Sequence, residues 1–322
     1  MDNNSKHKKI TPLQEKVPIL SLVCPFYNEE AVIDLFMKEV HSNIEPLEIP
    51  FEIICVNDGS QDETLKKLVE AKKRYPFLRV LNLSRNFGKE SALTAGLDYA
   101  TGEVIVPIDA DLQDPPELIP QFIAKWREGY DVVLAKRVDR TTDNLLKRIT
   151  AQLYYKFHNK IARPAIPENV GDFRLITRKV LNAIKQLPEN QRFMKGIFAW
   201  VGFNTCKVEY KRKKRAAGKT NFHGWSLWNF ALEGITGFST VPLRIWLYLG
   251  TAISLASLFY GTFIVFRTLI FGIDLPGYAS LLTSILFLGG VQLIGIGVIG
   301  EYLGRIYLET KKRPTYIVDK EY

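Results

Sequence analysis

Five short apolar runs, each followed by a polar or acidic turn and then a helix-forming segment, constrain the fold of this chain most strongly. The runs are Pro18–Cys24, Phe51–Val56, Leu78–Leu83, Glu103–Ile108 and Tyr130–Ala135. Strands that alternate with helices in this way form a parallel sheet with helices packed on both faces. The sequence therefore predicts an α/β fold whose strands end along one common rim.

Acidic side chains follow the fourth run directly. Asp109 and Asp111 flank a single alanine, and Gln113 comes shortly after them. The carboxyl end of a strand is where open α/β sheets bind ligands. These hard oxygen ligands suit Mg²⁺ or Mn²⁺, especially where substrate phosphates complete the coordination. A calcium EF-hand loop is excluded, because Asp114 and Pro120 occupy its glycine and glutamate positions. The alternative is an acidic surface turn that binds no metal.

Polar residues also follow the other strands. Asn28 and Glu29 come after the first run, Asp58 after the second and Lys89 after the third. Because parallel strands end at the same rim, this pattern favours a site in which these side chains meet the acidic pair. Two structural alternatives remain open at this stage. Asp58 could belong to a turn that caps a helix, and Lys89 could be a solvated surface charge.

Composition narrows the class of protein. At 322 residues the chain has room for a catalytic domain and a smaller part, and its net charge of +9 suits nucleic acid or an anionic membrane. The scattered Cys24, Cys55 and Cys206 are typical of free thiols in a reducing compartment. The histidines show no metal-ligand spacing. Residues 1–16 are polar and basic without an apolar core, which favours a flexible tail over a secretion signal.

Four motifs carry a resemblance to a known family. The chain resembles family 2 glycosyltransferases with the GT-A fold, a Rossmann-like and mostly parallel sheet, in the branch that uses polyprenyl phosphates. The motifs are Pro25-Phe26-Tyr27-Asn28-Glu29, Asn57-Asp58-Gly59-Ser60, Asn86-Phe87-Gly88-Lys89 and Asp109-Ala110-Asp111-Leu112-Gln113-Asp114-Pro115. Residues 169–175, 231–236 and 300–305 further resemble bactoprenol glucosyl transferases of phage-type O-antigen modification. The resemblance covers nearly everything after the tail.

The resemblance implies a UDP-sugar donor and a divalent cation. The donor-binding residues would be Pro25, Tyr27, Asn28, Glu29, Asp58, Lys89, Asp109 and Gln113. Asp109, Asp111 and Gln113 would hold Mg²⁺ or Mn²⁺ together with the diphosphate. This agrees with the chemistry of a UDP leaving group, whose developing negative charge a metal ion and fixed donors can stabilise.

The resemblance also implies a polyprenyl phosphate acceptor. Its phosphate would contact Arg137 and Arg140 after the fifth run, and Arg215, Lys219 and Thr220 in the basic run of residues 211–221. Arginine suits this task because its guanidinium binds phosphate oxygens in pairs. Asn221 departs from the family, where lysine is usual. The alternatives are a solvated charge run, or a nucleic-acid patch, although the basic run lacks the interleaved aromatic residues of single-strand binders.

Asp172 completes the catalytic set that the resemblance implies, with Asp111, Arg137, Arg140 and Arg215. In the family an acid at this place acts as a base or orients the acceptor. A phosphate monoester is already largely dianionic at neutral pH, since its second pKa is about 6. We therefore expect Asp172 to orient the acceptor. The alternative is that Asp172 has a purely structural role, in which Arg174 supports it.

The C-terminal third is apolar and predicts attachment to a bilayer. Residues 225–242 have the tryptophans and spacing of an amphipathic interface helix, with a buried soluble helix as the alternative. Two long uncharged stretches, Ile245–Phe266 and Leu275–Gly300, predict a transmembrane hairpin over residues 243–301. Basic segments on both sides place the catalytic domain of residues 17–224, the tail of residues 302–322 and both termini in the cytoplasm.

Glycines in the second stretch match a dinucleotide-binding pattern at Gly295–Gly300. We interpret this match as a coincidence, because no βαβ unit surrounds these glycines. Small residues in an apolar span instead permit close helix packing, which favours a homo-oligomer, a tetramer by family resemblance. We expect a multi-pass enzyme of the inner membrane that has no nucleic-acid partner.

The expected reaction is inverting transfer of glucose from UDP-glucose to undecaprenyl phosphate on the cytoplasmic face. Its product would serve O-antigen or other surface glycan modification. Two alternatives remain: the same reaction with amino-arabinose, an N-acetylhexosamine or mannose, or a catalytically silent membrane scaffold.

Overall fold

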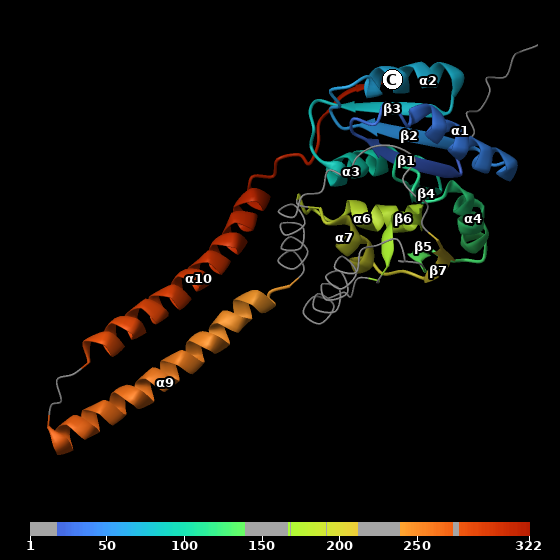
Figure 1. Ribbon diagram of the computed structural model, residues 1–322. Helices are drawn as coiled ribbons and strands as arrows, with labels where there is room; N and C mark the ends of the chain where they lie inside the picture. The colour runs from blue at the N-terminus through green and yellow to red at the C-terminus, as the bar shows by residue number, and fades with distance from the viewer. Residues whose placement is uncertain (1–17, 139–166, 168, 191, 212–238, 273–276) are drawn as a thin grey trace, which may run out of the picture.

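The computed structural model describes residues 18–138, 167, 169–190, 192–211, 239–272 and 277–322. Within these ranges the strands form one eight-stranded sheet in the order β7-β5-β6-β4-β1-β2-β3-β8 (Figure 1). The strands are β1 (Leu20–Phe26), β2 (Phe51–Asn57), β3 (Leu78–Leu83), β4 (Val104–Pro107), β5 (Val132–Arg137), β6 (Val170–Thr177), β7 (Thr205–Tyr210) and β8 (Val318–Glu321).

The centre of the sheet is parallel. Strand β1 lies between β4 and β2, and β2 also pairs with β3, all in the same direction. Strand β6 runs antiparallel to β4 and β5, and β8 runs antiparallel to β3. The prediction of a mostly parallel α/β sheet is confirmed. The antiparallel strands lie outside the repeated pattern on which that prediction was based.

Helices cover both faces of the sheet (Figure 1). One face packs against α1 (Ile33–Ile44), α2 (Thr64–Arg74) and α4 (Ile119–Arg127), and the other against α3 (Lys89–Tyr99), α6 (Arg178–Lys185) and α7 (Met194–Trp200). Two short 3-10 turns, η1 (Glu45–Leu47) and η2 (Pro116–Leu118), precede β2 and α4. Burial on both faces explains why the central strands read as continuous apolar runs.

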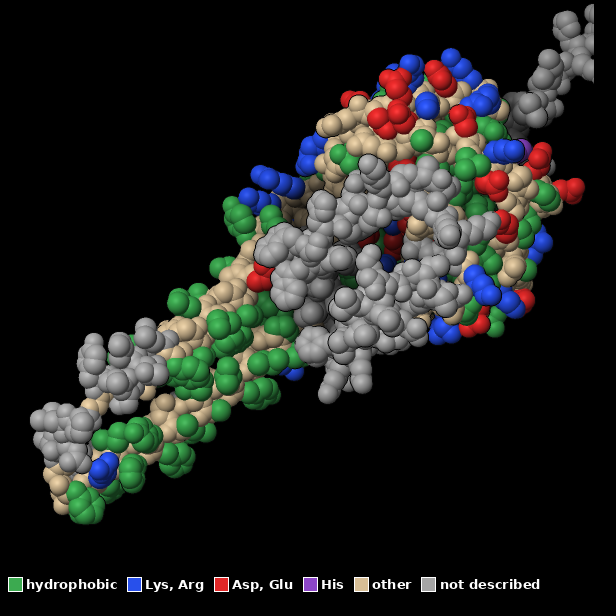
Figure 2. Space-filling view, in the orientation of Figure 1, with side chains coloured by type: hydrophobic (Ala, Val, Ile, Leu, Met, Phe, Trp, Pro, Cys, Tyr) green, Lys and Arg blue, Asp and Glu red, His purple; other side chains and the backbone are tan. Residues whose placement is uncertain are grey.

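Two long helices, α9 (Val241–Phe271) and α10 (Tyr278–Thr310), run side by side away from the sheet (Figure 1). Both are long and apolar enough to cross a membrane. Their apolar side chains face outward, with Phe259 at 74% and Leu293 at 70% exposure, and Figure 2 shows hydrophobic side chains along their length. An exposed apolar surface this extensive is typical of a membrane segment. Tyr302 on α10 donates a hydrogen bond to the carbonyl of Ser239, just before α9.

The C-terminal residues differ from the predicted tail of residues 302–322. Helix α10 continues to Thr310, and the chain then returns to the sheet, where β8 pairs with β3. Strand β8 is short and charged, as is usual for a protected sheet edge, so the sequence carried no apolar signal for it. The predicted tail of residues 1–16 and the predicted interface helix as far as residue 238 lie outside the described residues.

Charged side chains fasten this last strand to the domain. Arg79 on β3 contacts Glu321 on β8 at 2.8 Å and Glu52 on β2 at 2.9 Å. The Glu52 side chain is only 8% exposed and also accepts hydrogen bonds from Ser21 and Thr101. Burial alone would raise the pKa of Glu52, but these donors outweigh it and lower that pKa. One buried carboxylate thus links three parts of the sheet.

Replacing Arg79 with methionine should therefore destabilise the folded chain by about 1–3 kcal/mol, because a buried carboxylate loses a charged partner. The measurement is thermal unfolding of the full chain in detergent. Arg74→Met is the matched control, since Arg74 pairs with Asp34 between two well-exposed side chains. Equal losses of stability in the two variants would contradict the conclusion that the buried Glu52 needs Arg79 as its charged partner.

Candidate active site at the carboxyl end of the sheet

The turn after β4 presents two carboxylates to the rim. Asp111 is buried, at 7% exposure, and its Oδ1 accepts a hydrogen bond from the backbone N–H of Gln113 at 3.1 Å. Leu112 adopts a positive φ of 54°, which allows the turn to close tightly. The Asp109 side chain is more accessible, at 30% exposure. The predicted acidic turn is therefore built as a fixed structure with one buried and one accessible acid.

Lys89 joins this turn to a second strand. From the first turn of α3, its Nζ lies 2.7 Å from Asp109 after β4 and 3.1 Å from Asp172 on β6. Burial tends to lower the pKa of Lys89, but the two carboxylates outweigh it and raise that pKa above its usual value. Burial likewise tends to raise the pKa of Asp172, yet Lys89 and Lys195 bring it down to about 2. Asp172 can thus stay ionised at the rim although burial opposes its charge.

The loop before α3 determines where Lys89 lies. The carboxylate of Asp58 accepts hydrogen bonds from the backbone N–H groups of Phe87 at 2.8 Å and Gly88 at 3.0 Å. Burial raises the pKa of Asp58, although these donors oppose the rise. Gly59, at φ +64°, allows a close approach, because a Cβ atom there would lie 2.4 Å from the backbone of Arg85. The loop, and with it Lys89, rests on the turn after β2.

The turns after β1 and β2 are bonded to each other. Asn28, at a positive φ of 54°, donates its backbone N–H to Ser60 and accepts a hydrogen bond from the backbone of Gln61. The backbone N–H of Glu29 donates to Thr64 at 3.0 Å. These bonds leave the side chain of Tyr27 40% exposed at the rim. Pro25 lies at the end of β1, so all the donor residues predicted from sequence lie on this rim.

Arg137 closes the other side of the site at the end of β5. Its Nε donates to the hydroxyl of Tyr210 at 3.0 Å, and its Nη2 lies 3.8 Å from Asp114. Tyr210 in turn donates to the buried carboxylate of Asp114. A Cβ atom at Gly171 would lie 3.4 Å from Arg137, which places this guanidinium beside the segment that carries Asp172. The other predicted acceptor residues, Arg140, Arg215, Lys219 and Thr220, lie outside the described residues.

Sequence reasoning missed four residues of this cluster: Glu90, Asp114, Lys195 and Tyr210. Asp114 stands inside the acidic motif, and Glu90 follows Lys89 directly, so their positions were a usable signal. Burial, with the charge of Asp172, raises the pKa of Glu90 to about 8. One carboxylate oxygen of Glu90 and one of Asp172 are buried without a hydrogen-bond partner in the described part of the chain. Arg174, as the structural alternative proposed, donates to the backbone carbonyls of Gly171 and Asp172.

Among the described residues there is no cluster of three or more His, Cys, Asp and Glu side chains that could hold a metal ion. Asp109 and Asp111 nevertheless present hard oxygen donors from one turn, as Mg²⁺ and Mn²⁺ require. A cation between them would take its remaining ligands from Gln113, water or a substrate diphosphate. These ligands fit a site in which the substrate supplies part of the coordination better than a structural site in which the protein supplies all of it.

Comparison with known proteins agrees with this arrangement. Residues 21–185 match the family described as glycosyl transferase family 2, and residues 241–306 match the family described as GtrB C-terminal hairpin. This chain belongs to glycosyl transferase family 2. The first match covers the strands from β1 to β6, and the second covers α9 and most of α10. Family membership makes the chain an enzyme and associates the two apolar helices with a membrane.

Similar proteins of this family cover nearly the whole chain. An uncharacterized glycosyltransferase of Synechocystis is 55% identical over 93% of this chain and 94% of its own length. A prophage bactoprenol glucosyl transferase homolog of Escherichia coli is 56% identical over 94% of this chain and 98% of its own. The bactoprenol glucosyl transferase of Shigella phage SfII is 55% identical, with the same coverage.

The raised pKa of Glu90 predicts a pH-dependent stability. The unfolded carboxyl ionises near its ordinary value of 4.5 and the folded one near 8, so the folded state holds an extra proton between these values. Stability must then fall as the pH rises through this window. Glu90→Gln should remove this fall, so that the variant is more stable than the unaltered chain at pH 8 but not at pH 4.5.

Thermal unfolding in detergent at both pH values measures the effect. Glu103→Gln is the control, because Glu103 is exposed and should follow the unaltered chain. An identical pH dependence in the Glu90 variant would show that Glu90 is not held protonated.

Proposed function

We propose that this glycosyltransferase moves glucose from UDP-glucose to a polyprenyl phosphate at the cytoplasmic face of the inner membrane. The observation that carries the proposal is the rim where Lys89 joins Asp109 and Asp172, on a chain that also has two apolar helices long enough to cross a membrane. The names of the relatives from Escherichia coli and Shigella phage SfII support glucose as the sugar and a bactoprenol carrier as the acceptor. The product would serve O-antigen or other surface glycan modification.

The donor would lie along the turns after β1, β2 and β4. Tyr27 offers an exposed ring for the uracil, with Pro25, Asn28, Glu29 and Asp58 beside it. Asp109, Asp111 and Gln113 would hold Mg²⁺ or Mn²⁺ with the diphosphate, and the ion would neutralise charge on the UDP leaving group. Asp58 acts here by holding the loop that carries Lys89.

The acceptor phosphate would contact Arg137. Tyr210 and Asp114 hold this guanidinium in place, so little side-chain entropy is lost when it binds an anion. Arg140, Arg215, Lys219 and Thr220 are proposed as further phosphate contacts. In one displacement, a phosphate oxygen bonds to the anomeric carbon while the bond from that carbon to the UDP oxygen breaks, and UDP leaves with the electron pair. Displacement from the opposite face inverts the configuration.

Asp172 is proposed as an orienting group. Its pKa of about 2 makes it a weak base, and a phosphate monoester needs none. Through its contact with Lys89 it fixes the position of a cation beside the reacting groups. We further propose that the catalytic domain and both termini face the cytoplasm, because basic residues flank the hairpin, and that the chain forms a homo-oligomer, with a tetramer as the family's form.

The sugar can be identified directly. Membranes that contain the full chain should convert undecaprenyl phosphate and UDP-glucose into a glucosyl lipid, which mass spectrometry detects. A panel of other UDP-sugars and GDP-mannose tests the alternative donors, and a chain with no transfer from any of them would be the silent scaffold. A larger yield with a sugar other than glucose would contradict the proposed donor.

The acidic turn is the most direct target for mutation. Asp111→Asn should lower transfer by about 100-fold or more, because it removes one of the two carboxylates proposed for the cation. It should also weaken Mn²⁺-dependent binding of UDP, measured by calorimetry. Asp34→Asn on the exposed surface of α1 is the control. Near-normal transfer by the Asp111 variant would refute the metal role.

A further inference from the structure

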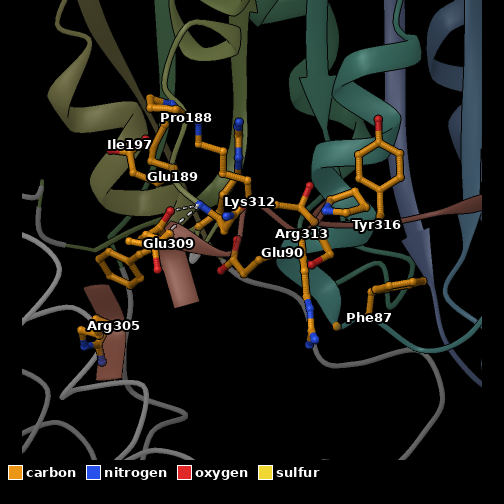
Figure 3. Close-up of a pocket in the computed structure, with 18 of the residues that line it drawn as sticks. Phe87, Glu90, Pro188, Glu189, Ile197, Arg305, Glu309, Lys312, Arg313 and Tyr316 are labelled. Carbon is orange, nitrogen blue, oxygen red and sulfur yellow. Dashed lines mark hydrogen bonds between the residues drawn. The ribbon is translucent and has the colours of Figure 1, made fainter. Parts of the chain in front are cut away.

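A cavity of about 1560 Å³ lies where the end of α10 meets the catalytic domain (Figure 3). Its wall comes from three parts of the chain: the start of α3 with Lys89 and Glu90, the stretch with Pro188–Asn190, Arg192, Phe193 and Ile197, and residues between Tyr302 and Tyr316. Its volume exceeds that of ordinary small-ligand pockets, which hold about 300–1000 Å³. One cavity therefore borders both the end of a candidate membrane span and the lysine that joins Asp109 to Asp172.

Basic side chains outnumber acidic ones around this cavity. The basic residues are Lys89, Arg192, Arg305, Lys312 and Arg313, and the acidic residues are Glu90, Glu189 and Glu309. Glu309 already accepts the backbone N–H of Asn190 with both oxygens, the bonds dashed in Figure 3. The wall therefore carries an excess of positive charge.

Part of this positive charge has no partner among the residues that the structure describes. The side chains of Lys312 and Arg313 make no hydrogen bond or ion pair with any residue that the structure describes. The Nε of Arg192 is buried and likewise lacks a hydrogen-bond acceptor in the described part of the chain. Lys312 and Arg313 can therefore bind an anion without first breaking an ion pair that the structure describes.

The wall is held in place by the strand that follows it. Tyr316 donates a hydrogen bond to Asp98 on α3 at 2.9 Å, and the carbonyl of Ile317 accepts the backbone N–H of Ser84. Strand β8 then pairs with β3. Because α10 and β8 are both fixed, the segment that carries Arg313 is held at both ends, and it lines the cavity together with the start of α3 (Figure 3). The cations are thus part of a built wall rather than a free tail.

We propose that this cavity receives the phosphate of the lipid acceptor at the membrane surface and guides it to Lys89, with Arg313, Lys312 and Arg192 as its contacts. This inference rests on the proposed function, since it assumes a lipid phosphate as acceptor. A phosphate monoester carries close to two negative charges at neutral pH and binds best to several cations at once. The remaining volume accommodates the first part of the apolar chain beside Ile306 and Phe193.

The position of the cavity favours the acceptor over a structural phospholipid. A phospholipid seated here would occupy the space next to Lys89, and the acceptor phosphate must reach that space. Of the predicted donor-binding residues, all of which the structure describes, only Lys89 lines the cavity. Changes at Arg313 and Lys312, which were not predicted to bind the donor, should therefore act on the acceptor alone.

The test is a kinetic comparison of full-length variants in detergent micelles, with undecaprenyl phosphate and UDP-glucose varied in turn. Arg313→Gln, and Arg313→Gln combined with Lys312→Gln, should raise KM for the lipid phosphate by about 10-fold or more and leave KM for UDP-glucose unchanged. Arg313→Lys should raise KM for the lipid phosphate less than Arg313→Gln does, because lysine keeps the charge but not the paired donors.

Lys311→Gln is the matched control. Lys311 stands beside the pair, lies over the ring of Tyr307 at 4.1 Å and does not line the cavity. An unchanged KM for the lipid phosphate in the Arg313 variants would overturn the inference, and so would an equal rise in Lys311→Gln. A repeat in vesicles with and without anionic phosphatidylglycerol tests the other source of phosphate. A rise in KM for the lipid phosphate that is seen only with the anionic vesicles would assign these cations to the bilayer surface and overturn the inference.

The proposed function and the proposed path of the acceptor can be tested separately. If the unaltered chain transfers no sugar to undecaprenyl phosphate, the proposed function is wrong. If it does transfer sugar and the Arg313 variants behave like the unaltered chain, only the proposed path of the acceptor is wrong.

Discussion

The contact of Lys89 with Asp109 and Asp172 is the interaction on which the site depends. Two carboxylates from β4 and β6 would repel each other at one rim, and one of them would tend to take up a proton. A single ammonium group lies between them, and its charge helps to lower the pKa of Asp172 to about 2 against the effect of burial. The surrounding structure fixes the position of Lys89. Asp58 holds the loop before α3 by two hydrogen bonds, and Gly59 leaves room for that loop to approach.

The same rim is tied to the apolar hairpin by the C-terminal part of the chain. Glu309 bonds to the segment before α7, Tyr316 bonds to α3, and β8 completes the edge of the sheet. These contacts hold the rim at a fixed place relative to the apolar helices, as the proposed reaction on a lipid phosphate would require. The cavity lies between these two parts.

Sequence patterns predicted the sheet, the two apolar helices and the acidic turn, because each has a local signature: continuous apolar strands, long uncharged stretches and paired aspartates after a strand. They could not predict β8, whose charged residues pair only because β3 offers an open edge. Nor could they predict the partners of Lys89, which was expected at the rim with a solvated charge as the alternative, or the link from Arg137 through Tyr210 to Asp114. These contacts join residues far apart in the sequence, and only the fold brings them together.

The most direct measurement is a double-mutant cycle between Lys89 and Asp172, determined for the transfer rate and for the free energy of unfolding. We predict strong coupling, about 0.5–3 kcal/mol, with the double variant little worse than the poorer single variant. The exposed pair of Lys136 and Glu209, at 3.0 Å, provides the control cycle and should show little coupling. Additive losses at Lys89 and Asp172 would contradict the central claim that these two side chains act as one unit.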